Sequence, residues 1–159
     1  MSKSRFSRLS MLATLSFAIL FGVMAAAPSA FAEDEEHAIK YRKSVMKSLG
    51  GHMGATAAIV GGKAGQPGHL AGHVAAIVDI STIAKDLFPE GSDFGETTVL
   101  AKVWDEPDAF KRELRMFEAQ AAAFGKAAGS GDMAAIGAAM GNLGKSCKSC
   151  HENFREKKQ

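Results

Sequence analysis

Apolar residues recur at helical spacing in four stretches of the chain, separated by glycine and proline. The spacings of three, four and seven residues are typical of amphipathic helices that pack in a bundle. The stripes comprise Ile39, Met46, Leu49, Met53 and Val60 in 34–60; Leu70, Val74, Ile77, Ala84 and Phe88 in 69–88; Phe110, Leu114, Phe117, Ala121, Phe124 and Ala128 after Pro107; and Ile136, Met140, Leu143, Cys147, Cys150 and Phe154 after Asp132. No stretch alternates with a period of two over a useful length. The pattern predicts an all-α fold of four antiparallel helices.

Helix-ending and helix-starting residues mark the boundaries of these stretches. A glycine pair ends the first, and Pro89 ends the second. Pro107 suits the first turn of the third helix, and Asp132 can cap the fourth. A longer connection, around 91–106, contains the only tryptophan, Trp104. We therefore expect short turns between the helices of each pair and a long link in the middle of the chain.

The stripe of the fourth helix ends in a Cys-x-x-Cys-His motif at 147–151. This is the attachment signature of c-type haem, in which two thiols bind the haem vinyl groups and the adjacent imidazole ligates the iron. The alternatives are a helical disulfide, a thioredoxin-type redox pair and half of a zinc site. A thioredoxin-type redox pair usually follows a strand, and no strand pattern precedes this motif. A zinc site would need further ligands, and the chain has no other cysteine. The motif favours one covalent haem c on Cys147 and Cys150, with His151 as the axial iron ligand.

Both cysteines continue the apolar stripe of their helix, at spacings of four and three residues. A haem attached there would lie in the core between the helices. His151 lies one turn beyond Cys147, beside the same stripe, so one helix can present both the thiols and the imidazole. The apolar core would then be the haem pocket.

Residues 1–32 have the parts of a secretory signal peptide. Lys3, Arg5 and Arg8 precede an almost wholly apolar run over 9–24, and Ala-Phe-Ala at 30–32 forms a cleavage site. An uncleaved anchor is the alternative, because the run approaches the roughly 18 residues that a membrane span needs. The small residues and the acidic run that follow favour cleavage. The interpretation predicts export to the bacterial periplasm, a mature domain of 33–159 and no membrane span after cleavage.

Cleavage also changes the charge balance. The full chain has 19 Lys and Arg and 17 Asp and Glu; removal of three basic residues leaves 16 against 17, a net charge of −1. A nucleic-acid-binding protein would show a clustered basic face, so no nucleic acid partner is expected.

Three segments in this order resemble the class II cytochromes c, that is, cytochrome c′ and its low-spin relatives. They are 144–155 around the Cys-x-x-Cys-His motif, 41–50 in the first helix and 103–110 in the long connection. The resemblance covers the whole mature chain and implies an up-down-up-down four-helix bundle that encloses a covalently bound haem. It also implies a homodimer through the first two helices, where small residues allow close approach: Ala57, Ala58, Ala71 and Ala75.

The resemblance assigns further residues to the haem. Arg155 matches the basic residue that the family places close to the proximal imidazole. Arg42 and Lys43 match first-helix positions next to the haem and its propionates, and Thr97 lies in the connection that lines the haem edge. An ordinary solvated surface is an equal alternative for Arg42, Lys43 and Thr97, because charged and polar side chains are mostly exposed.

Met46 falls at the family's distal position, facing the iron from the first helix. In cytochrome c′ an apolar residue there crowds the iron without ligating it, and the iron stays open to nitric oxide or carbon monoxide. In the low-spin relatives a methionine is the sixth ligand, and Met/His ligation suits electron transfer. A flexible core filler is the simplest alternative for this methionine. The sequence leaves Met46 as a distal residue that ligates or crowds the iron.

Two functions follow from the resemblance. The first is a periplasmic electron carrier with an unidentified redox partner protein, and the second is a haem protein that binds or buffers nitric oxide or carbon monoxide. We expect no enzyme, because no distal His/Arg pair is visible to cleave a bound substrate. His69 and His73, four residues apart, could share a helix face as a surface metal pair, but a solvated face is the stronger interpretation. His52 is a weaker candidate still.

Overall fold

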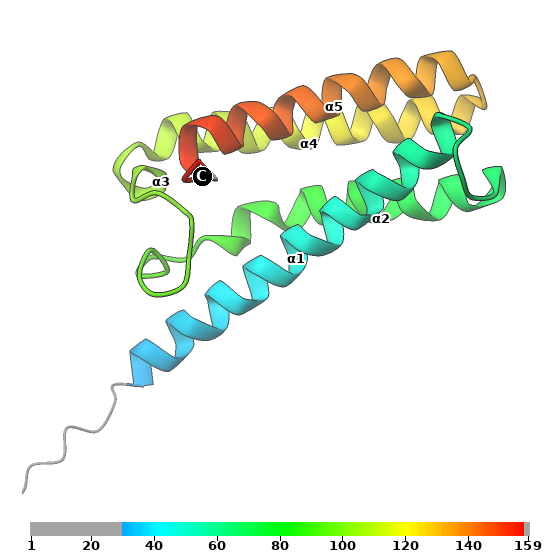
Figure 1. Ribbon diagram of the computed structural model, residues 1–159. Helices are drawn as coiled ribbons and strands as arrows, with labels where there is room; N and C mark the ends of the chain where they lie inside the picture. Colours follow the sequence, from blue (N-terminus) through cyan, green and yellow to red (C-terminus); the bar gives the residue numbers. More distant parts are fainter. Residues whose placement is uncertain (1–29, 158–159) are drawn as a thin grey trace, which may run out of the picture.

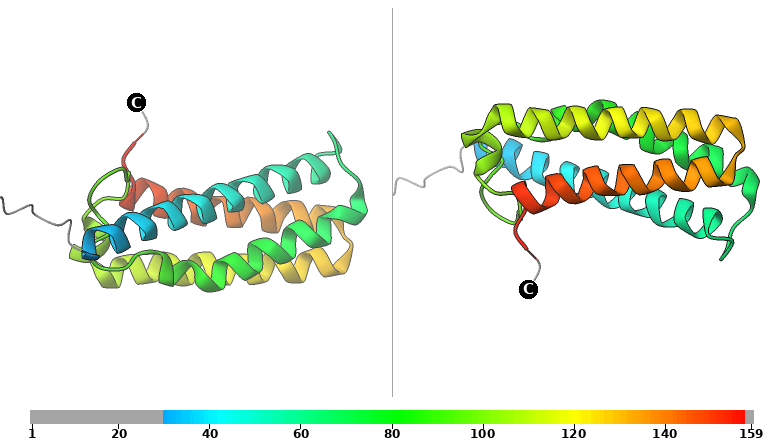
Figure 2. Two further views of the ribbon diagram at one scale, coloured as in Figure 1. Left: turned by 90° about the horizontal axis from the view of Figure 1, so that it is seen from below. Right: turned by 90° about the horizontal axis from the view of Figure 1, so that it is seen from above.

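The computed structural model describes residues 30–157 (Figures 1 and 2). Residues 1–29, most of the predicted signal peptide, lie outside this range. The described elements are α1 (Ala30–Val60), a 3-10 turn (Pro67–His69), α2 (Leu70–Ile83), a second 3-10 turn (Ala84–Leu87), α3 (Lys102–Asp105), α4 (Pro107–Ser130) and α5 (Met133–Phe154). The four predicted helices are confirmed as α1, α2 with its flanking turns, α4 and α5. None of the helices within 30–157 is long and apolar enough to cross a membrane.

The four long helices run up, down, up and down. Figures 1 and 2 show α1 beside α2 and α4 beside α5, with α2 packed against α4. Contacts between α1 and α5 are few, and the two helices diverge towards the start of α1. The all-α bundle predicted from the sequence is therefore observed, with one pair of neighbouring helices held apart at one end.

The turn between α4 and α5 forms as the sequence predicts. Gly131 adopts a left-handed conformation, with φ at 71°, and its N–H donates to the carbonyl of Ala128. Asp132 then caps α5: its carboxylate accepts hydrogen bonds from the N–H groups of Ala134 and Ala135, at 2.9 and 3.3 Å. Such a cap is worth about 1 kcal/mol, so the turn fixes the start of the helix that carries the Cys-x-x-Cys-His motif.

The apolar stripes meet in two clusters. The larger fills the middle of the bundle and contains fully buried side chains from three helices, including Ile77, Phe124 and Leu143. Burial of each of these side chains contributes roughly 1.5–3 kcal/mol. Gly125 lets α4 approach α2 closely, because a Cβ atom there would lie 3.0 Å from a methyl group of Val78. The large cluster therefore holds the bundle together away from the divergent end.

The smaller cluster lies at the divergent end of the bundle. Val103, Phe110 and Phe154 are its buried members, and Phe110 packs edge-on against Phe88 and Phe154 with ring centroids 4.8 and 5.2 Å away. Val103 belongs to α3, a single turn that the sequence did not predict. This aromatic cluster fixes the long connection against the ends of α4 and α5.

Candidate functional site

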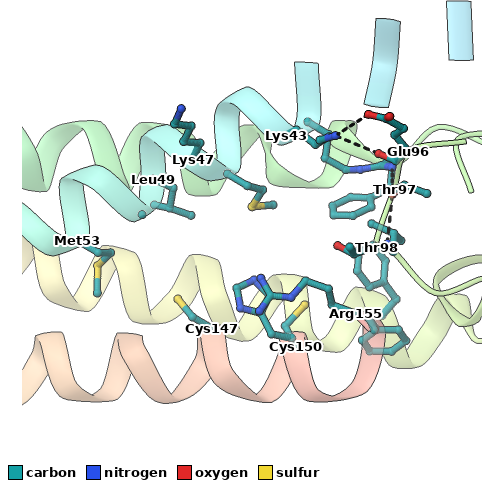
Figure 3. Close-up of a pocket in the computed structure, with 18 of the residues that line it drawn as sticks. Lys43, Lys47, Leu49, Met53, Glu96, Thr97, Thr98, Cys147, Cys150 and Arg155 are labelled. Carbon is teal, nitrogen blue, oxygen red and sulfur yellow. Dashed lines mark hydrogen bonds and ion pairs between the residues drawn. The ribbon is translucent and has the colours of Figure 1, made fainter. Parts of the chain in front are cut away.

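A cavity of about 860 Å³ lies between α1 and α5, where the two helices diverge. The connection after α2 closes its end. In Figure 3, Leu49 and Met53 extend from α1 on one side, and Cys147 and Cys150 lie on the opposite side. The volume falls in the upper part of the range for cofactor pockets, and the lining is largely apolar around a few polar groups.

The two cysteines connect the cavity to both apolar clusters. Cys147 packs against the large cluster and Cys150 against the small one, and both thiols are free. Burial raises the pKa of Cys147, and burial together with the charges of Glu113 and Cys147 raises the pKa of Cys150 to about 11. These thiols stay protonated near neutral pH, unlike the thiolate of a redox pair.

Within residues 30–157, neither a disulfide nor a set of zinc ligands is found at the motif. Cys147 and Cys150 are not joined to each other. Across residues 30–157, no group of three or more His, Cys, Asp and Glu side chains is placed to hold a metal ion, so a zinc site has no ligand set.

His151 lines the same cavity and lies one residue beyond Cys150 on α5. The His151 side chain is exposed at the cavity, but desolvation by its surroundings and the positive charge of Arg155 lower the pKa of its imidazole. Neutral imidazole is the form that ligates a metal, so both effects favour ligation. Arg155 is half-buried and also lines the cavity, while a place on the proximal side of a haem stays a prediction.

The residues after α5 hold the connection in place. The N–H of Leu100 donates to the carbonyl of Phe154 at 3.0 Å, and the N–H of Glu156 donates to the carbonyl of Thr98 at 2.8 Å. Val99 and Arg155 thereby form an isolated antiparallel bridge. The sequence did not predict this contact, because neither segment has the length or alternation of a strand. It closes the cavity immediately beyond His151.

Arg42 is buried, with 3% of its surface exposed, and this contradicts the interpretation of a solvated side chain. Its guanidinium donates to the carbonyl of Leu87 (3.2 Å), to the hydroxyl and carbonyl of Ser92 (2.7 and 2.8 Å) and to the hydroxyl of Thr97 (3.0 Å). The guanidinium also lies over the ring of Phe88, 5.2 Å from its centroid. Burial lowers the pKa of Arg42. Arg42 therefore fastens the connection to α1 at the edge of the cavity.

Lys43 and Thr97 lie on the same edge (Figure 3). Lys43 is exposed; its ammonium donates to the carbonyl of Glu96 at 3.2 Å and lies 3.8 Å from the Glu96 carboxylate. Thr97 is half-buried, and its hydroxyl accepts hydrogen bonds from Arg42 and from the N–H of Val99. All three residues assigned to the haem edge line the cavity, while a contact with propionates stays a prediction.

Met46 is half-buried, packs against the large cluster and lines the cavity from α1. Met53, one heptad further along, lines it too. The sequence placed Met53 on the stripe but gave it no role at the site. The distal wall therefore offers two thioethers, and ligation by Met46 stays a prediction.

The weaker alternative for His69 and His73, a metal pair on one helix face, is not what the structure shows. His73 lies against His52 of α1, with their Nδ1 atoms 3.0 Å apart, while His69 is exposed in the preceding turn. The neighbour of His73 is thus distant in sequence.

The residues at the cavity fit a c-type haem. Two protonated thiols one helical turn apart and an imidazole favoured in its neutral form face a large, mostly apolar space. Arg42, Lys43 and Arg155 supply positive charge at its rim, which suits the carboxylates of a propionate-bearing group.

Comparison with known proteins agrees with this fit. The family model described as Cytochrome C′ matches residues 37–155. The chain belongs to the cytochrome c′ family. Membership implies a haem c cofactor.

Curated relatives and solved structures match over most of their length. A cytochrome c′ from Pararhodospirillum photometricum is 40% identical over 119 residues, which cover 74% of this chain and 95% of the relative. A cytochrome c-556 from Agrobacterium fabrum is 37% identical over 150 residues, or 92% of this chain and 97% of the relative. The structure of cytochrome c′ from Shewanella frigidimarina has a TM-score of 0.74 at 32% identity, covering 79% and 98% of the two chains.

Proposed function

We propose that this protein is a periplasmic electron carrier whose single haem is attached to Cys147 and Cys150, with His151 as the axial ligand. The observation that supports this most directly is the convergence of all three side chains on one large apolar cavity inside a family bundle. A haem bound there supplies one-electron redox chemistry at its iron.

The chain's own residues set the conditions for this function. The large apolar cluster excludes water on the inner side of the cavity, and the bonds from Arg42 and from the residues after α5 keep the connection fixed over its end. Such fixed walls limit the rearrangement of the protein when the charge of a bound group changes. Arg42 and Arg155 place positive charge at the cavity, which favours the reduced, more negative state.

The proposal extends to processing and assembly. Residues 1–32 would direct export, the mature chain would form a dimer through α1 and α2, and a separate redox protein would exchange electrons with it. Ala57, Ala71 and Ala75 are exposed and Ala58 is half-buried, so this face is open to a second copy. The protein would carry electrons without catalysing a reaction of its own.

A second function, binding of nitric oxide or carbon monoxide, draws on the solved relatives. A variant of cytochrome c′ from Alcaligenes xylosoxidans was solved as a nitric oxide complex and matches this chain with a TM-score of 0.72 at 29% identity. A carbon-monoxide-bound variant of the same protein matches at 0.71 and 28%. The distal side chain, Met46, separates the two functions.

The optical spectrum of the ferrous protein, with and without carbon monoxide, tests the proposal. If Met46 ligates, the spectrum shows sharp α and β bands, carbon monoxide binds slowly or not at all, and Met46→Ala opens the sixth position. If Met46 only crowds the site, the wild type is already high-spin and Met46→Ala binds carbon monoxide faster. Met53→Ala is the matched control, because Met53 lines the same wall one heptad away. A spectrum and rate unchanged by Met46→Ala contradict both roles.

A further inference from the structure

His52 and His73 bring two imidazoles together where α1 packs on α2. Their Nδ1 atoms lie 3.0 Å apart, their ring centroids 5.3 Å apart, and the ring planes are inclined by 56°. Both side chains are half-buried, and neither lines the haem cavity. The pair is a cluster of metal-ligating nitrogens that the proposed electron carrier does not use.

In the arrangement found, the two nitrogens point at each other, and one imidazole N–H donates to the other ring's nitrogen. We propose that a divalent transition-metal ion, Cu²⁺, binds between these nitrogens and replaces the hydrogen bond. The donor ring exchanges its Nδ1 proton for one on Nε2 through water, with no net proton release, so that both neutral rings carry a proton on Nε2 and both Nδ1 lone pairs are free to ligate.

The separation of the nitrogens fits this use. With metal–nitrogen bonds of about 2.0–2.1 Å, two neighbouring ligands lie about 2.9 Å apart at a right angle and about 3.3 Å apart at the tetrahedral angle. The observed 3.0 Å lies between these values, so the two nitrogens are already within the span of one ion's ligands. Cu²⁺ binds nitrogen ligands more tightly than Ni²⁺ does.

The rings must turn to reach one ion. Changes in the side-chain torsions must re-aim both lone pairs from the line between the nitrogens to a common point beside it, and the χ2 torsion of histidine has a broad distribution. The backbone can stay in place, because the ligands come from two helices that are already packed.

Solvent reaches the pair, because both imidazole side chains are only half-buried. Since the described residues hold no group of three or more His, Cys, Asp and Glu side chains around a common point, water completes the coordination. The site is therefore a two-imidazole chelate that ties α1 to α2.

Titration of the ferric, haem-loaded protein with aqueous Cu²⁺ tests the proposal, by calorimetry and by electron paramagnetic resonance. We expect about one Cu²⁺ per chain, with hyperfine structure from two nitrogens. His52→Ala and His73→Ala should each weaken binding at least tenfold and remove the two-nitrogen pattern. His69→Ala is the matched control and should bind as the wild type does, because His69 is exposed outside the pair.

A second measurement guards against a variant that loses binding through misfolding. Cu²⁺ should raise the melting temperature of the wild type and of His69→Ala, since it binds only the folded pairing of α1 and α2, and should leave that of His52→Ala unchanged. Equal binding by all variants would overturn the site. Loss of binding in His69→Ala with retention in His52→Ala would also overturn it, because the ligands would then be neighbours on one helix face. A stoichiometry of half a Cu²⁺ ion per chain would overturn it as well.

Discussion

Replacement of Arg42 by methionine should destabilise the protein more than any other single change at the edge of the cavity. Methionine keeps an apolar stem of similar length but removes four hydrogen bonds and the stacking on Phe88. The hydroxyls of Ser92 and Thr97 keep other partners, so two carbonyls, those of Leu87 and Ser92, lose their donor. Each orphaned carbonyl costs about 1–3 kcal/mol.

The stacking adds about 0.5–1 kcal/mol to this loss, and relief of the guanidinium's own desolvation offsets part of it. We expect the free energy of unfolding to fall by about 2–4 kcal/mol. For a domain of this size, that corresponds to a melting temperature about 8–15 °C lower.

Denaturation of the haem-loaded protein in guanidinium chloride, followed by circular dichroism, measures the loss. Lys43→Met is the control: Lys43 is the next residue, but it is exposed and pairs only with the exposed Glu96, so its loss should stay below about 0.5 kcal/mol. Arg42→Lys should fall between the two, because one ammonium cannot replace a planar group with several donors. If Arg42→Met and Lys43→Met lose the same free energy of unfolding, the hydrogen bonds of Arg42 are not what holds the connection against α1.

Three further predictions concern the core, the haem and the dimer. Thr56→Val should stabilise the protein by about 1–2 kcal/mol in the same denaturation assay, because the Thr56 hydroxyl is fully buried without a partner; a loss of stability would contradict this. Cys147→Ala with Cys150→Ala should abolish covalent haem and reduce helical circular dichroism, and haem that resists acid–acetone extraction from the double variant would disprove the attachment. Sedimentation should show a dimer that Ala75→Arg dissociates; a strict monomer at high micromolar wild-type concentration would remove the dimer but not the fold.

The heptad pattern of the first helix predicted more of the fold than of the site. Its apolar members were correctly placed on the buried face of α1, but the same stripe contains two polar positions, Arg42 and Thr56, and both are buried. Stripe counting ignores polar residues. A buried arginine requires partners, and those of Arg42 lie 45 to 55 residues away, in a connection without periodicity.

On α5 the motif and its spacing were sufficient to bring Cys147, Cys150 and His151 to one cavity, while their roles toward a haem stay predictions. Contacts between distant segments were not predictable in the same way. His73 pairs with His52 rather than with His69, because the packing of α1 on α2 decides which face of each helix meets the other. The bridge between Val99 and Arg155 likewise depends on where α5 ends in space, which no local pattern contains.

The bridge between Val99 and Arg155 also determines when the cavity can close, because it fastens the connection over the cavity only once α5 is in place. Among the described helices α5 is synthesised last, whereas α1, α2 and α4 can already pair through their own apolar stripes. The thiols, the imidazole and the segment that secures the connection all arrive with or after this final helix. A chain emerging in order therefore exposes its Cys-x-x-Cys-His motif before the connection is fastened over the cavity, which leaves an interval in which both thiols are accessible.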